Sequence, residues 1–139
     1  MKNRNHIFVD TNILIGAYSG HEIDRNCLQY LFSLTGKRLF ISSLSIAQFV
    51  SVFQKSRVNA DIKQAVNYYI GKFNVIDFSL KDISHALTFD IADVEDSIQY
   101  VISSKFSCFY FVTNNIKDYT KFMDLDVVNS LKIRKIRKI

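Results

Sequence analysis

The sequence predicts an α/β fold, arranged as three layers (α/β/α) with a small, mostly parallel central sheet between helices. Two observations support this prediction. Short apolar runs rich in β-branched and aromatic residues alternate with segments of helical periodicity, which favours parallel strands joined by crossover helices. The first run, residues 6–9, is continuous rather than alternating, as expected for a strand buried on both faces. The length of 139 residues fits a single domain spanning 1–139.

The expected elements follow one another without a linker, a repeat or a low-complexity stretch. Strands are expected at residues 6–9, 38–41, 74–78, 108–113 and 125–128. Helices are expected at residues 12–18 and 23–34, from 43 to about 55, from 59 or 61 to about 73, from 79 onward, and from 93 to about 105. Ser42 or Ser43 is a suitable cap for the third helix, and Ser79 with Asp82 has the spacing of a capping box.

Polar residues follow two of the predicted strands directly. Asp10 comes after residues 6–9, and Thr113, Asn114 and Asn115 end the run CFYFV. The carboxyl ends of parallel strands share one edge of a sheet, and ligands bind beyond that edge. The two polar groups therefore predict a functional site there.

A third polar group lies in DVEDSIQYV, residues 93–101, where Asp93, Glu95 and Asp96 fall in the first turn of a helix. A helical wheel places Tyr100 on the side of Asp93 and Asp96. The opposite side is an apolar stripe of Val94, Ile98, Val101 and Ile102. Acids in a first turn also complement the helix dipole, so a purely structural role stays open. Together with Asp10, these carboxylates would repel one another, and a hard cation such as Mg²⁺ or Mn²⁺ explains their convergence best.

Three stretches in this order resemble the motifs of PIN domains, and they cover nearly the whole chain. They are IFVDTNILI, ISSLSIAQFV and DVEDSIQYVISSKFSCFYFVTNNIKDY. The likeness is strongest to the branch that includes VapC-type toxins. The resemblance implies a metal-dependent endoribonuclease that cleaves single-stranded RNA. It also implies three or four acids around one or two Mg²⁺ or Mn²⁺ ions, held by a small parallel sheet.

The resemblance assigns roles to residues near the first and last motifs. Asp10 is similar to the first acid of the family and Asp96 to the third, so both are expected to bind the metal. Thr11 and Asn12 correspond to the polar residues that order the first turn. Thr113 is the hydroxyl residue just before the place of a fourth acid.

The sequence departs from the family at two positions. Gln48 stands where many PIN domains have Glu, and Asn115 stands at the place of the fourth acid. An amide keeps a ligating oxygen but loses the negative charge, so metal affinity should fall. Asp118 is three residues from Asn115 and is expected to share the catalytic role with it. Asp93 and Glu95 are further acids that can compensate for the lost charge, and the sequence does not choose among them.

Two alternatives stay open at this point. A PIN fold that no longer cuts, and that binds RNA or a protein, is motivated by Gln48 and Asn115. An aspartyl-phosphate hydrolase would use Asp10 as its nucleophile, but such enzymes usually have a second acid where this chain has Asn12.

The positive charge is concentrated at the end of the sequence, LKIRKIRKI. The net charge is +5, and five cations stand in this tail: Lys132, Arg134, Lys135, Arg137 and Lys138. A basic patch suits a phosphate-rich partner such as RNA. The tail can equally be a solubilising segment whose isoleucines, Ile133, Ile136 and Ile139, pack on the body of the protein.

The remaining composition excludes some classes of protein. No stretch has the ~20 consecutive apolar residues of a membrane span. The N-terminus MKNRNHIFVD does not predict a signal peptide, and Cys27 and Cys108 lack metal-type spacing, so a cytoplasmic protein with reduced thiols is expected. TGK at 35–37 lacks the upstream glycine of a phosphate-binding loop. A homodimer and a small antitoxin protein are partners that only the resemblance implies.

Overall fold

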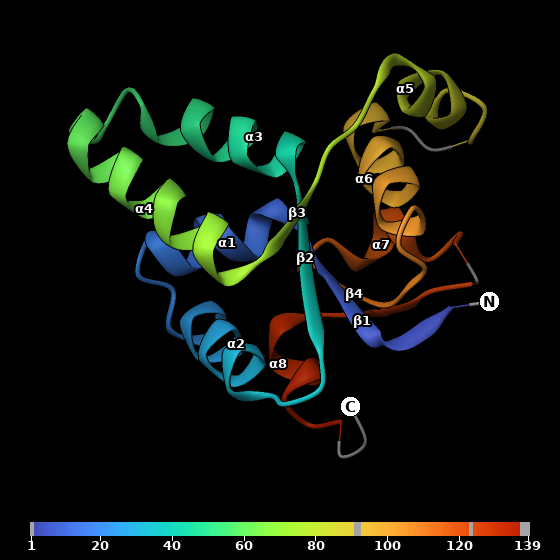
Figure 1. Cartoon of the computed structure of the whole chain (residues 1–139), viewed down its shortest axis with the longest axis horizontal. Helices are drawn as coiled ribbons and strands as arrows, with labels where there is room; N and C mark the ends of the chain where they lie inside the picture. The colour runs from blue at the N-terminus through green and yellow to red at the C-terminus, as the bar shows by residue number, and fades with distance from the viewer. Residues whose placement is uncertain (1, 91–92, 123, 137–139) are drawn as a thin grey trace.

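The central feature of the computed structural model is a five-stranded sheet in which every neighbouring pair of strands is parallel (Figure 1). The structure describes residues 2–90, 93–122 and 124–136. The strands are β1 (Asn3–Val9), β2 (Arg38–Ser42), β3 (Asn74–Ile76), β4 (Cys108–Val112) and β5 (Asp126–Val128). Their order, β3-β2-β1-β4-β5, places β1 in the middle of the sheet, between β2 and β4.

Helices connect the strands and cover both faces of the sheet. In the described residues they are α1 (Thr11–Tyr18), α2 (Glu22–Ser33), α3 (Ser43–Phe53), α4 (Asn59–Lys72), α5 (Leu80–Ala86), α6 (Val94–Ser104), α7 (Ile116–Tyr119) and α8 (Ser130–Ile133). The first six confirm the predicted helices to within one or two residues at most of their ends. The sequence analysis missed α7 and α8, because four residues are too short to show helical periodicity.

The alternation of side chains along each strand produces two separate cores. Ile7 and Val9 of β1 face a core that is packed by α1, α2, α3, α4 and α8. Phe8, between them, faces a second core packed by α5, α6 and α7. Figure 1 shows these two groups of helices on either side of the strands. The predicted three-layer α/β/α arrangement is therefore confirmed, with both faces of the sheet buried.

β1 begins at Asn3, three residues before its predicted start, and β3 is two residues shorter than predicted, while the other strands agree with the prediction to within one residue at each end. The expected strand at 74–78 ends at Ile76, because Ile76 pairs with Ser42, the last residue of β2, and no strand residue lies beyond it. The predicted caps are present: the Ser42 hydroxyl accepts a hydrogen bond at the start of α3, and the Ser79 backbone N–H donates to Asp82 at 2.9 Å. The end of β3 at Ile76 is therefore set by the loss of pairing with β2, and not by the residue preferences of the sequence.

The basic tail packs its apolar residues and exposes its charges. Ile133 of α8 is fully buried beneath α2, and Ile136 packs against the same core. Lys132, Arg134 and Lys135 are exposed. Arg137, Lys138 and Ile139 lie outside the described residues. Among the helices that the structure describes, none has the length and apolarity to cross a membrane.

Candidate functional site

The candidate site lies at the edge where β1 and β4 end and where α6 and α7 begin. Asp10 directly follows β1 and caps α1, and its backbone N–H donates to the carbonyl of Val112 at the end of β4. Asp93 caps α6, and Asp96 lies in the first turn of that helix. Asp118 lies on the short helix α7. The chain thus brings four acids to one edge from three separate segments.

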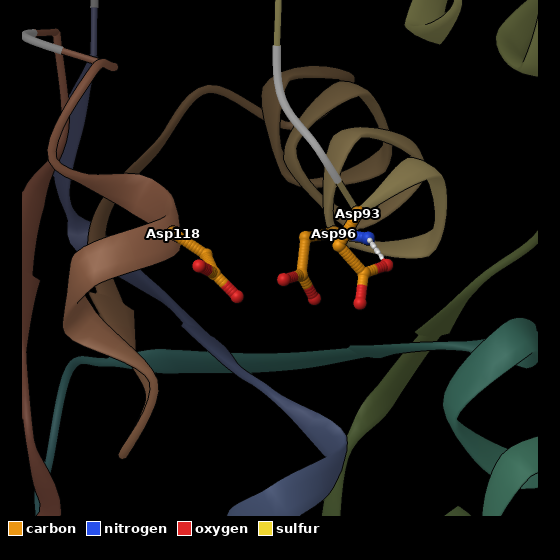
Figure 2. A group of neighbouring side chains, drawn as sticks. All are labelled: Asp93, Asp96 and Asp118. Carbon is orange, nitrogen blue, oxygen red and sulfur yellow. Dashed lines mark hydrogen bonds between the residues drawn. The ribbon is translucent and has the colours of Figure 1, made fainter.

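Three of these acids form a compact group. Asp93, Asp96 and Asp118 each offer one oxygen, and these oxygens all lie within 4.8 Å of one another. Figure 2 shows Asp118 on one side, facing Asp96 and Asp93 across the gap between their helices. In the part of the chain that the structure describes, no basic side chain forms an ion pair with any of the three. Their mutual repulsion is thus not offset by a protein cation.

Asp10 lies beneath this group and is held in place by hydrogen bonds. It is only 5% exposed, and burial raises the pKa of its carboxyl despite several hydrogen bonds that act in the opposite direction. The donors are the Thr11 backbone N–H at 2.8 Å, the Thr113 hydroxyl at 2.9 Å, Asn12 Nδ2 at 3.3 Å and Gln99 Nε2 at 3.4 Å. Thr11, Asn12 and Thr113 thus surround the first acid. The sequence analysis named Asp10 and Asp96 as the metal ligands. In the structure, the acids whose oxygens lie close to those of Asp96 are Asp93 and Asp118.

Asp96 is surrounded by the other carboxyls of the site, and burial and these carboxyls raise its pKa. Its pKa is raised to about 7, first by burial and then by the neighbouring carboxyls of Asp118, Asp93 and Asp10. The Tyr119 hydroxyl donates to Asp96 Oδ1 at 3.0 Å and counteracts this rise. Since crowding by like charges disfavours the ionised form, a bound cation would be expected to favour it.

Asn115, at the place of a fourth acid, connects the carboxylates instead of adding a charge. Its Nδ2 donates to Asp118 and lies 3.4 Å from Asp96 Oδ2. Its backbone N–H donates to the Thr113 hydroxyl oxygen at 3.0 Å. The N–H dipoles of this amide therefore offset part of the repulsion between the carboxylates of Asp96 and Asp118.

Gln48 also lies at the site, on α3. Its side-chain oxygen accepts a hydrogen bond from the Thr11 hydroxyl at 2.6 Å. Its Nε2 donates to the exposed carboxylate of Glu95 on α6. Gln48 thus links the first turn of α1 to the start of α6, and both of its polar groups are engaged.

The sequence analysis missed Gln99, which connects several parts of this edge. Gln99 is 1% exposed, and its Nε2 donates to the Thr11 hydroxyl at 3.0 Å and to the Ser45 hydroxyl at 2.8 Å. Its oxygen accepts from the Ser42 hydroxyl at 2.6 Å. A signal was available, because Gln99 adjoins the apolar residues of α6, where an amide needs a polar partner.

Two residues of α6 lie apart from the groups with which they share a side of the helix. Tyr100 does not join Asp93 and Asp96: its hydroxyl donates to Asp124 at 2.8 Å, and its ring stacks on Phe122. Seven helical residues span about 10 Å, so a residue on the same side as Asp93 can still lie far from the edge of the sheet. Val94, predicted in the buried stripe, is 47% exposed, because the first turn of α6 extends beyond the core.

A hydrogen-bond network behind the site, centred on the buried Asp24, was also missed. The Asn114 backbone N–H donates to Asn12 Oδ1 at 3.1 Å, and Asn114 Nδ2 donates to Asp24 Oδ1 at 2.8 Å. Asp24 is 2% exposed, and its other oxygen contacts His21 Nδ1 at 2.8 Å. These contacts set the orientation of Asn12, whose Nδ2 then faces Asp10.

The parallel five-stranded sheet between two layers of helices matches the three-layer α/β/α fold of PIN domains. The predicted resemblance to the VapC-type branch is confirmed by the comparisons with known proteins, although no family model matches the chain. The chain is 23% identical to Ribonuclease VapC1 from Aquifex aeolicus (strain VF5), over an alignment of 139 positions that covers 92% of this chain and 92% of that one.

Solved structures support the same fold. A chain of VapBC2 from Rickettsia felis, bound to a promoter DNA fragment, matches with a TM-score of 0.69 and 22% identity, over 89% of this chain and 98% of that one. A chain of VapBC-1 from nontypeable Haemophilus influenzae matches with a TM-score of 0.69 and 17% identity, over 90% and 98%. A chain of a toxin-antitoxin complex from Klebsiella pneumoniae matches with a TM-score of 0.65 and 22% identity, over 86% of this chain and 95% of that one. At these identities the structural likeness establishes the fold.

Proposed function

We propose that this chain is a metal-dependent endoribonuclease that cleaves single-stranded RNA as the toxin of a toxin–antitoxin pair. The observation that carries the proposal is the group formed by Asp93, Asp96 and Asp118, which has no basic partner among the described residues. It lies at the edge where parallel α/β folds bind their ligands. The similarity to Ribonuclease VapC1, and to chains of VapBC complexes, supports the same activity.

The donor set fits a hard divalent cation. Carboxylate oxygens are the ligands that Mg²⁺ and Mn²⁺ prefer, and Asp93, Asp96 and Asp118 would hold the ion. When bound, such an ion neutralises charge on a phosphate oxygen and lowers the pKa of a bound water. Asp10, fixed by its donors, adds negative charge beneath the same edge, because it raises the pKa of Asp96. No residue outside this edge is needed to complete a six-coordinate site, since waters fill the remaining positions.

The other residues of the site keep the carboxylates in place. Asn115 Nδ2 donates to Asp118 and lies 3.4 Å from Asp96 Oδ2, so it contacts both carboxylates. Gln48 donates to Glu95 and so holds this carboxylate near the site. The negative charge of Glu95 replaces part of the charge that a glutamate at position 48 would supply. Thr11, Asn12 and Thr113 fix Asp10. Each side chain thus restricts the position of a carboxylate before substrate arrives, which lowers the cost of assembling the site.

Substrate and partner assignments follow from the proposed activity. The exposed cations of the tail, Lys132, Arg134 and Lys135, would contact the RNA backbone, and we extend this role to Arg137 and Lys138. We further propose that the chain acts as one domain in the cytoplasm, forms a homodimer and is masked by an antitoxin. The VapBC complexes among the similar structures motivate the antitoxin.

The proposal is tested by incubating the purified protein with single-stranded RNA in Mn²⁺, Mg²⁺ or EDTA. Asp96→Asn and Asp118→Asn are expected to reduce cleavage at least a hundredfold, because each removes a ligand. Asp61→Asn, which changes an exposed acid on α4 away from the site, is the matched control and should cleave like the wild type. Cleavage that persists in EDTA, or in both site variants, would refute the proposal.

A second candidate is a PIN fold that binds without cutting. The engagement of Gln48 with Glu95, and of Asn115 with two aspartates, is the observation that favours it. A folded protein that binds RNA but cleaves none under any metal would support this reading. An aspartyl-phosphate hydrolase is disfavoured, because Asp10 is buried and its oxygens already accept several hydrogen bonds.

A further inference from the structure

Tyr119 is a fully buried tyrosine whose hydroxyl reaches the acidic edge. It is the last residue of α7 and follows Asp118 directly. Its ring packs against Phe111 of β4, with centroids 4.3 Å apart. Its hydroxyl donates to Asp96 Oδ1 at 3.0 Å. The packed ring leaves the hydroxyl little freedom, so it presents a donor at a fixed point of the site.

The two oxygens of Asp96 are therefore held by different groups. Tyr119 donates to Oδ1, and Asn115 Nδ2 lies 3.4 Å from Oδ2. The tyrosine contact is the shorter one, and a buried phenol has no water with which to exchange it. Tyr119 thus determines the rotation of the carboxylate that lies between Asp93 and Asp118 in the acidic group.

We infer that Tyr119 is a positioning residue, whose phenol O–H fixes Asp96 in the orientation that a divalent cation requires. The inference rests on the proposed function, since it assigns Asp96 to metal binding. It also explains how a site with two amides in place of acids can retain affinity. The remaining carboxylates are preorganised, so less conformational freedom is lost when the ion binds.

The competing explanation is that Tyr119 only fills the core between the sheet and α6. Tyr69 provides a matched comparison, because it is also buried and its hydroxyl donates to a neutral acceptor, the Leu14 carbonyl, at 3.1 Å. Replacing either tyrosine by Phe removes one oxygen and one buried hydrogen bond while keeping the ring. A purely structural role predicts the same result for both variants.

The test is a calorimetric titration of Mn²⁺ into the wild type, Tyr119→Phe and Tyr69→Phe, with thermal melting to establish that each is folded at the titration temperature. Tyr119→Phe is expected to weaken Mn²⁺ binding about tenfold or more. Tyr69→Phe should stay within twofold of the wild type. Replacing Tyr119 by 4-aminophenylalanine, which restores a donor on the same ring, should recover most of the affinity.

Equal affinities in the two Phe variants would overturn the inference, and so would a wild type that binds no Mn²⁺. Should Tyr119→Phe fail to fold, the 4-aminophenylalanine variant decides: a folded protein with wild-type affinity supports the role of the donor, and a folded protein with lost affinity refutes it. RNA cleavage is measured on the same samples. A wild type that binds Mn²⁺ without cleaving RNA would refute the nuclease proposal, while the affinities would still test the role of Tyr119.

Discussion

Asp24 of α2 occupies the space that a side chain at Gly16 of α1 would need. A Cβ at position 16 would lie 1.9 Å from Asp24 Oδ2. Because glycine leaves this space open, α1 and α2 approach closely and the buried Asp24 reaches Asn114. The closeness of these two helices thus supports the network behind Asp10.

Gly16→Ala is therefore expected to destabilise the protein by about 1–3 kcal/mol, because the added methyl must displace a buried carboxylate. Gly71→Ala is the control, since Gly71 lies in α4 with nothing within 4 Å of the added Cβ. It should stabilise the protein by about 0.5–1 kcal/mol, because alanine favours the helix. Urea denaturation measures both changes. Equal effects of the two substitutions would contradict the packing described for Asp24.

Asn12→Asp is expected to destabilise the protein more at pH 8 than at pH 5. The substitution removes the Nδ2 donor to Asp10 and places a second carboxylate beside it. Burial already raises the pKa of Asp10. A like charge favours protonation of the native carboxyl further, so stability is lost as the pH rises.

Asn12→Ala controls for the lost hydrogen bonds, because it adds no charge. Its destabilisation, about 1–3 kcal/mol, should be similar at the two pH values. The measurement is the free energy of unfolding from urea titrations at pH 5 and pH 8. A loss for Asn12→Asp that does not grow with pH would show that Asp10 and residue 12 do not interact electrostatically.

Without metal, the wild type is expected to lose stability as the pH rises from about 4 to 7. The pKa of Asp96 is about 7 in the native state against an ordinary value of 3.8, so between these values the native state holds a proton that the unfolded chain has released. The stabilisation that comes from this proton is complete below pH 3.8 and is lost as the pH rises through about 7. Asp96→Asn should flatten the slope in that window, as measured by urea denaturation in EDTA. An unchanged slope in the variant would assign the pH dependence to other groups.

Gln48→Glu is expected to lower the melting temperature in EDTA, because it places a carboxylate against Glu95 in place of a donated hydrogen bond. Added Mn²⁺ should raise the melting temperature of this variant more than that of the wild type, since it gains a negative charge near the site. The double variant Gln48→Glu, Glu95→Gln restores an amide–carboxylate pair and should recover the stability in EDTA. If the double variant melts as low as the single one, the contact between α3 and α6 is not the cause.

Local signals predicted most of the fold and the edge at which the site lies. The continuous apolar run before Asp10 and the polar residues after CFYFV are properties of neighbouring residues. The grouping of the acids was harder, because it depends on contacts between distant segments. Thr113 donates to Asp10 across 103 positions in the sequence, a contact that no local pattern predicts.

Burial of polar residues was the other limit. Gln99 has no charge and belongs to no motif, and only its place beside apolar residues of α6 signals that its amide needs a polar partner. Its contacts with Thr11, Ser42 and Ser45 connect three elements. Tyr100 shows the opposite error, since its periodicity is correct but its distance along α6 removes it from the edge. Periodicity gives the face of a helix, and only the packed structure gives the position along it.

Because β1 lies between β2 and β4 in the sheet, it cannot be paired on both sides until residues far along the chain have been made. β1 is made first, but its partner β4 begins at Cys108, and Asp118 and Tyr119 follow later still. Until those residues leave the exit tunnel, Asp10 lacks the Thr113 hydroxyl and Asp96 lacks the Tyr119 hydroxyl. A nascent chain therefore has no assembled acidic edge until Thr113, Asp118 and Tyr119 have left the tunnel and folded against β1 and α6.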